Sequence, residues 1–279
     1  MKERAYAFGE GGGLYGILTE PEASSDRPVV ILLNAGLVHR VGPFRVSVDL
    51  ARRLAALGFC TLRMDLSGLG DSAPRPSEPD LHRRVLADLR DAMDFLGQRR
   101  GARRFIVGGI CSGAINAHRA AVADPRVVGM IMLDGYAYST TQFLLRRYGP
   151  RLASPGAALR FVGRQVSSLL TTLPAAPAPP EGQGEDDDIL SQDFPPQERV
   201  ATELRQLMER NVALLFVYSG NWYLYFNYPE QIRDNFPDVP FGDRLTVEHF
   251  PDADHTYTLL EDRERLFATL LRWVQQRFG

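Results

Sequence analysis

Apolar residues gather in short runs along this chain, and the runs are separated by longer stretches with a helical spacing. A continuous apolar run is typical of a strand that is buried on both faces of a sheet. Five such runs occupy residues 28–34, 59–65, 104–110, 127–133 and 212–220, and the more polar stretch RLTVEHF at 244–250 is a further expected strand. Two partly alternating runs, 4–8 and 14–20, flank the glycines of 9–13 and are typical of a hairpin. The pattern predicts eight strands.

Between these runs, apolar side chains recur every three or four residues, which predicts helices. The expected helices cover residues 46–57, 80–97, 112–120, 157–170, 196–210 and a C-terminal stretch on Leu266–Phe278. Strands that alternate with helices indicate a parallel sheet with helices on both faces, so the expected fold class is α/β.

The alternation breaks between residues 136 and 196. Residues 174–188 are proline-rich, then acidic, and lack the large apolar groups that could order them. We expect 136–196 to be a helical lid insertion at the carboxyl edge of the sheet, where ligands bind in such folds. Residues 1–135 and 197–279 then form a single core domain.

Composition narrows the class of protein further. A chain of 279 residues can be stable without a disulfide or metal, and its two cysteines have no metal-binding spacing. We therefore expect a reducing compartment, no metal and no cofactor. The net charge is −2 with both signs interspersed, which does not favour nucleic acid. Without a signal-like N-terminus or an apolar stretch of membrane-spanning length, a cytoplasmic protein is expected.

The turn Gly109-Ile110-Cys111-Ser112-Gly113 carries a candidate nucleophile. It joins an apolar strand to a helix of small residues, and the flanking glycines suit a sharp turn whose ends lie too close for side chains. The helix would direct its N-terminal amides at the sulfur and favour thiolate. A register with Ser112 at the tip would put Ile110 where a small residue is needed. Cys60, within the run FCTLRM, has the character of a buried hydrophobe.

His255 is the candidate base for this thiol. It lies in PDADHTY, between the last expected strand and the last helix. His82 and His118 fall on expected helices and His249 within a strand, where structural roles are commoner. A base placed after the last strand suits the nucleophile–acid–histidine order of the motif.

The residue that orients His255 is open between two candidates. The turn after strand 212–220, where an acid is usual, has no aspartate near the strand end. Asp134 ends the preceding strand and could reach the same histidine. Asn221 could instead complete a Cys-His-Asn arrangement, because a thiol needs less help than a hydroxyl. Asp252 and Asp254 are too near His255 in sequence to orient its ring easily.

Backbone amides should stabilise the oxyanion: that of Ser112 and that of Gly36 or Leu37, in the loop after strand 28–34. In that loop His39 and Arg40 could recognise a polar or anionic substrate group, although a solvated loop is the simpler interpretation. Trp222 and Tyr223 could line an apolar acyl pocket or pack under a lid.

Taken in order, strand 28–34, DLSGLGDS, the GICSG turn and PDADH resemble the α/β-hydrolase superfamily from about residue 12 to the C-terminus. The stretch from NAGLVHRVGPFR to DLSGLGDS is most similar to serine-aminopeptidase-type hydrolases, including exosortase-associated hydrolases, whose branch can carry cysteine at the turn. Dienelactone hydrolase is a more distant relative with a cysteine. The resemblance implies an α/β-hydrolase fold with a mostly parallel, eight-stranded sheet.

These features favour acyl transfer through a Cys-His-Asp/Asn triad and an acyl-thioester enzyme intermediate. Because a thiolate is also a good leaving group, we expect a thioesterase or acyltransferase that acts on CoA-bound or carrier-bound acyl groups. An acyl or peptidyl carrier protein would then be a partner. The alternatives are a carboxylesterase or lactone hydrolase, a non-catalytic binding protein of the same fold, and a redox sensor that uses Cys111.

Overall fold

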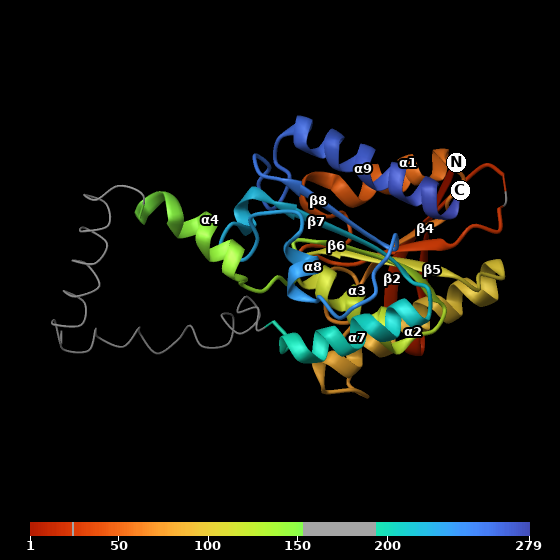
Figure 1. The fold of residues 1–279 in the computed structure, drawn as a ribbon. Helices are drawn as coiled ribbons and strands as arrows, with labels where there is room; N and C mark the ends of the chain where they lie inside the picture. Colours follow the sequence, from red (N-terminus) through yellow and green to blue (C-terminus); the bar gives the residue numbers. More distant parts are fainter. Residues whose placement is uncertain (24, 153–193) are drawn as a thin grey trace, which may run out of the picture.

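The eight expected strands form one sheet in the computed structural model, which describes residues 1–23, 25–152 and 194–279 (Figure 1). The strands are β1 (Lys2–Phe8), β2 (Leu14–Glu20), β3 (Val29–Leu32), β4 (Thr61–Asp65), β5 (Phe105–Ile110), β6 (Val127–Leu133), β7 (Ala213–Ser219) and β8 (Leu245–Phe250). Their order is β1-β2-β4-β3-β5-β6-β7-β8. The pairs β1–β2 and β2–β4 are antiparallel and all others are parallel. The prediction of a mostly parallel, eight-stranded sheet is confirmed.

Helices cover both faces of this sheet (Figure 1). On one face lie α1 (Val46–Ala56) and α9 (Leu260–Phe278), and on the other lie α2 (Leu81–Arg100), α3 (Ser112–Ala123) and α7 (Gln197–Glu209). Two further helices, α4 (Thr141–Leu152) and the short α8 (Gln231–Asn235), follow the carboxyl ends of β6 and β7. Single 3₁₀ turns occupy Glu10–Gly12, Pro43–Arg45 and Gly220–Trp222.

The apolar core is divided by the sheet into two clusters. Along β5, Phe105 and Val107 belong to the cluster beneath α2, α3 and α7, whereas Ile106 and Ile110 belong to the cluster beneath α1 and α9. Successive side chains of a strand point to opposite faces, so a strand buried on both sides must be apolar throughout. This explains the continuous apolar runs, and it leaves the carboxyl edge of the sheet for the polar residues.

Part of the expected lid insertion lies outside the residues that the structure describes. The expected helix at 157–170 and the proline-rich loop at 174–188 lie within 153–193, which the structure does not describe, so the lid stays a prediction. Helix α4 was not expected from the sequence. Among the described residues, no helix is both long and apolar enough to cross a membrane. The cytoplasmic location stays a prediction.

Candidate active site

Cys111 lies at the tip of a tight turn between β5 and α3. Its backbone has a φ of 60° and a ψ of −121°, which is strained for a residue with a side chain. A Cβ atom on Gly109 would lie 2.7 Å from the carbonyl carbon of Gly113, so only glycine allows this approach. The Cys111 amide donates to the carbonyl of Leu133 at 2.9 Å, which ties the turn to the end of β6. The expected sharp turn is present, with the thiol at the first position before the helix.

His255 lies in the loop between β8 and α9 and contacts the thiol side chain. Its Nδ1 atom is 2.7 Å from Oδ2 of Asp134, and the ring also shares a hydrogen bond with Cys111. Burial alone would lower the pKa of His255, but the hydrogen bonds with Asp134 and Cys111 and their negative charges raise it from 6.5 to about 9. The imidazole therefore links the sulfur to a carboxylate, as a base for the thiol must.

Asp134 is fully buried, and three donors satisfy its carboxylate. Ser219 donates its amide to Oδ1 and its hydroxyl to Oδ2, both at 2.6 Å, while Oδ2 also meets His255. These hydrogen bonds fix the position of the buried carboxylate. Asn221, the alternative orienting residue, is exposed and has no hydrogen bond with His255 within the described chain. Of the two candidates, Asp134 is the one in contact with His255.

The loop that carries His255 packs directly on the loop that follows β7. The Gly220 amide donates to the carbonyl of Ala253 at 2.9 Å. A Cβ atom on Gly220 would lie 1.9 Å from the carbonyl oxygen of Pro251, so this contact requires glycine. This close approach places His255 at the ends of β6 and β7, in contact with Asp134.

Of the two amides predicted in the loop after β3, one already has a partner. Gly36, at a φ of +54°, donates its amide to Oγ of Ser112 at 2.8 Å. The amides of Leu37 and Ser112 have no acceptor among the described residues. Gly36 therefore holds the loop against α3 and is not an oxyanion donor in this arrangement. Leu37 and Ser112 remain the candidates.

Arg40 has a structural role that the sequence pattern did not reveal. Its guanidinium pairs with the buried Asp65 and, at 2.7 Å, with Asp71, and its backbone amide donates to Asp65 at 2.6 Å. Asn34 donates to the same Asp65 at 2.9 Å. These bonds fasten the loop after β3 to the loop after β4. Arg40 is thus committed within the chain, and we do not place it in the substrate site.

The side chains of His39, Asp65 and Asp71 could in principle converge on a metal ion, because their ligand atoms lie within 4.8 Å of one another. However, the Arg40 guanidinium is bonded to all three, at 2.7 Å from Nε2 of His39. A guanidinium supplies the positive charge that a cation would bring, so this cluster is a closed ion-pair network rather than a metal centre.

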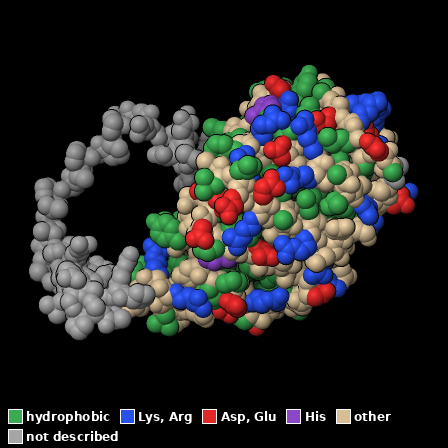
Figure 2. Space-filling model, turned by 90° about the horizontal axis from the view of Figure 1, so that it is seen from above, with side chains coloured by type: hydrophobic (Ala, Val, Ile, Leu, Met, Phe, Trp, Pro, Cys, Tyr) green, Lys and Arg blue, Asp and Glu red, His purple; other side chains and the backbone are tan. Residues whose placement is uncertain are grey.

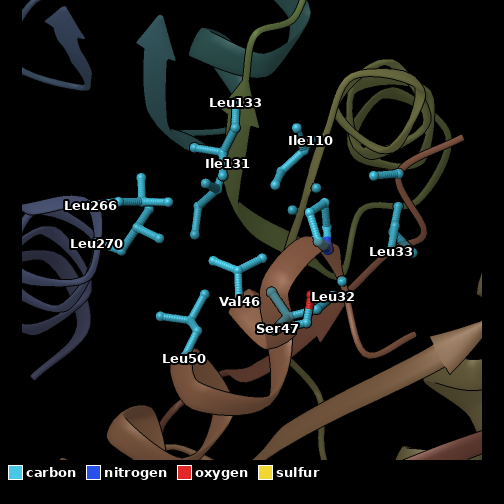
Figure 3. Close-up of a pocket in the computed structure, with 15 residues that line it drawn as sticks. Leu32, Leu33, Val46, Ser47, Leu50, Ile110, Ile131, Leu133, Leu266 and Leu270 are labelled. Carbon is cyan, nitrogen blue, oxygen red and sulfur yellow. The ribbon is translucent and has the colours of Figure 1, made fainter. Parts of the chain in front are cut away.

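An apolar cavity of about 30 Å³ lies behind the turn (Figure 3). Side chains from α1, α9 and the ends of β5 and β6 point into it, among them Val46, Leu266, Ile110 and Leu133. Cys111 packs against the same apolar cluster. The turn therefore packs on apolar side chains on one side. On the other side Cys111 meets His255, which comes from a loop at the carboxyl edge of the sheet.

The segments that follow the carboxyl ends of the strands carry many exposed apolar side chains. Among the described residues, thirteen large apolar side chains are exposed, and ten of them lie on segments that follow the carboxyl ends of β3, β6, β7 and β8: Leu37, Val38, Phe44, Leu144, Leu145, Tyr223, Leu224, Tyr225, Leu259 and Leu260. Tyr223 is 61% exposed, whereas Trp222 is half-buried and stacks on His255. Of the two predicted aromatic residues, only Trp222 touches the candidate catalytic residues.

A doubly covered parallel sheet with a strained turn after β5 and a histidine after the last strand defines the α/β-hydrolase class. Residues 30–278 match the model of the alpha/beta hydrolase family, and the chain belongs to that family. A search among curated proteins returned no match.

Solved structures share the fold at low sequence identity. A protein from Xanthomonas campestris, described as an a/b serine hydrolase without lid, is 16% identical with a TM-score of 0.56, and the match covers 100% of this chain and 95% of that one. Proline iminopeptidase from Mycobacterium smegmatis is 18% identical with a TM-score of 0.56 (99% and 98% covered). A cold-adapted esterase from an Arctic intertidal metagenomic library is 13% identical with a TM-score of 0.55 (99% and 93% covered).

Proposed function

We propose that this alpha/beta hydrolase is a cysteine-dependent enzyme that transfers the acyl group of an ester or thioester. Cys111 is the nucleophile, His255 the acid–base and Asp134 the orienting carboxylate. The observation that carries the proposal is the position of His255, which is hydrogen-bonded both to the thiol and to a buried carboxylate 121 residues away. Structural histidines rarely need both partners, whereas a nucleophile–base–acid relay does.

In the first half-reaction the Cys111 sulfur attacks the substrate carbonyl carbon, and the proton of the thiol resides on His255. The negative charge that develops on the carbonyl oxygen is stabilised by the amides of Ser112 and Leu37. As the bond to the leaving oxygen or sulfur breaks, His255 gives its proton to that atom. An acyl group is then joined to Cys111 by a thioester bond.

The second half-reaction reverses these roles. His255 removes a proton from a water molecule or from the hydroxyl of another acceptor. The oxygen of that water or acceptor attacks the acyl carbon at the same time. Cys111 leaves as thiolate, and Asp134 stabilises the imidazolium that forms. The product is a carboxylic acid, or an acyl group on the new acceptor.

Two features favour a thioester with an apolar acyl chain as the substrate. Exchange between thioesters is nearly balanced in energy because both leaving groups are thiolates. Ten exposed apolar side chains lie on segments that follow the carboxyl ends of the strands, at the edge of the sheet that also carries the nucleophile, and an alkyl chain bound at that edge would contact some of them. Charges of both signs are interspersed on the face seen in Figure 2, which suits a small-molecule substrate, free or bound to CoA or a carrier protein, better than nucleic acid.

The alternative of a non-catalytic protein of this fold rested on the missing acid after β7. That position is occupied by Ser219, whose hydroxyl bonds to Asp134, so a carboxylate reaches His255 from the neighbouring strand instead. A redox sensor would have no use for this carboxylate. We therefore prefer the acyl-transfer enzyme to both.

Steady-state turnover of a matched substrate panel tests the proposal. The panel contains p-nitrophenyl esters, acyl-CoA thioesters and lactones, and the variants are Cys111→Ala, His255→Gln and the control Cys60→Ala. We expect hydrolysis by the wild type and the control, fastest for thioesters, and a loss of roughly 10³-fold or more in Cys111→Ala. Equal rates in wild type and Cys111→Ala would refute the proposed nucleophile. Faster turnover of esters or lactones would reassign the substrate class.

A further inference from the structure

Trp222 lies face to face with His255. The two ring centroids are 5.1 Å apart and the planes are inclined by only 10°. The indole is itself fixed, because its Nε1 atom donates to the carbonyl of Gly135 at 2.8 Å. Gly135 directly follows Asp134, so one short segment anchors both the carboxylate and the indole that contact the imidazole.

Resting on the proposed function, we infer that Trp222 is a positioning residue for His255: it fixes the plane of the imidazole and stabilises its protonated form. An aromatic face attracts a cation placed over it, and the attraction grows when the pair is partly removed from water. Asp134 and Cys111 hold the imidazole by hydrogen bonds in the plane of the ring. The indole packs against its face and so limits the tilt of the ring about the line between these two contacts.

The groups that face His255 show why such support is needed. The carboxylate of Asp134 comes from the end of β6, the thiol of Cys111 from the turn after β5, and the indole of Trp222 from the turn after β7. Partial burial opposes the positive charge, while Asp134 and Cys111 favour it. The charge of Asp134 also acts on the pKa of His249 and on that of Tyr257. Neither of these two residues contributes to the pKa shift of His255.

Two substitutions separate the two contributions of the indole. Trp222→Phe keeps an aromatic face but removes the hydrogen bond to Gly135. Trp222→Leu keeps apolar bulk and removes the aromatic face as well. A residue that only filled space would tolerate both changes with similar effects, whereas a cation-stabilising face is lost only in the leucine variant.

Alkylation of Cys111 gives a readout that needs no substrate. Iodoacetate is an anion and iodoacetamide is neutral, so the ratio of their rate constants reports the charge on the neighbouring imidazole. The Cys60→Ala background leaves Cys111 as the sole thiol. With the Trp222 side chain intact we expect the ratio to fall between pH 6 and 10 with a midpoint near 9. Trp222→Leu should lower this midpoint by about 0.5–1 pH unit, and Trp222→Phe by less.

A second measurement protects the test against a variant that folds poorly. In a Trp273→Phe background, Trp222 is the remaining tryptophan, and a protonated imidazole in contact quenches indole fluorescence. The emission should rise with the same midpoint near 9, and the rise should be absent in His255→Gln. An unchanged alkylation midpoint in Trp222→Leu, or no His255-dependent rise, would overturn the role of Trp222. Alkylation that is equally fast in His255→Gln and wild type would instead overturn the proposed function.

Discussion

Nδ1 of His255 lies 2.7 Å from Oδ2 of Asp134, so the imidazole is oriented from the end of β6 and not from β7. The β7 position carries Ser219, which donates its amide and hydroxyl to the same carboxylate at 2.6 Å. The end of β6 therefore supplies the carboxylate of Asp134, and Ser219 at the end of β7 supplies two of its hydrogen bonds. Against the effect of burial, Asp134 and Cys111 together raise the pKa of His255.

Asp134→Asn should lower kcat/KM by roughly 10²–10⁴-fold, because a neutral amide cannot stabilise the imidazolium and can hold the wrong tautomer. The matched control is Asn221→Ala, which changes an exposed residue of the next loop. We expect its kcat/KM to stay within a few-fold of wild type. A large loss in Asn221→Ala with little effect of Asp134→Asn would invert the assignment.

The pH dependence of acylation follows from the raised pKa of His255. The imidazolium that protonates the leaving group persists up to about pH 9, so kcat/KM should decline only as the pH rises through 9. Removing the Asp134 charge should shift this alkaline limb toward the ordinary histidine value of 6.5. A rate profile with its alkaline limb near 6.5 in the wild type would show that the hydrogen-bonded pair does not form in solution.

The two cysteines should differ strongly in reactivity. Burial raises the pKa of Cys60 to about 11, so its thiolate is scarce at neutral pH and its access is poor. We expect iodoacetamide at pH 7 to modify Cys111 at least about 100-fold faster than Cys60. Peptide mapping after a timed quench measures both rates in one sample. Comparable labelling of the two sites would argue against an activated thiol at Cys111.

His118 should make the fold sensitive to acid. It is buried on α3, with Nε2 3.7 Å from Glu203, and burial lowers its pKa to about 4. Because the unfolded chain binds the proton more readily, stability is present above pH 6.5 and is lost as the pH falls through 4. The expected contribution is roughly 3 kcal/mol between pH 7 and pH 4.

Urea unfolding of wild type and His118→Gln at several pH values isolates this contribution, since all other titratable groups are present in both proteins. The free-energy difference between the two should shrink on acidification. A difference that stays constant with pH would mean that His118 binds its proton equally well in the folded and the unfolded state.

Much of this architecture is predictable from the sequence, because burial on both faces of the sheet dictates continuous apolar runs. The runs predicted all eight strands, and the spacing Gly109–Cys111–Gly113 predicted the turn. Asp134 and His255 were predictable as candidates since each follows the carboxyl end of a parallel strand. Such ends share one edge of the sheet.

Contacts between loops could not be predicted from the sequence pattern. The pairing of Arg40 with Asp65 and Asp71, and the bond from Gly36 to Ser112, join segments whose local patterns carry no sign of each other. The stacking of Trp222 on His255 likewise depends on how two loops pack, through the contact that Gly220 permits with Pro251. Helix α4 contains Gly149 and Pro150, residues that disfavour the interior of a helix, and the sequence pattern did not predict it.

Intact-mass spectrometry of the acyl-enzyme tests the central claim most directly. The Cys60→Ala protein is mixed with a short-chain acyl thioester, quenched in acid after milliseconds to seconds, and weighed alongside the Cys60→Ala/Cys111→Ala protein. We predict a mass gain of one acyl group, located on Cys111, that forms and decays at rates compatible with turnover and is absent in the double variant. Turnover that proceeds without this adduct, or survives the loss of Cys111, would contradict the account.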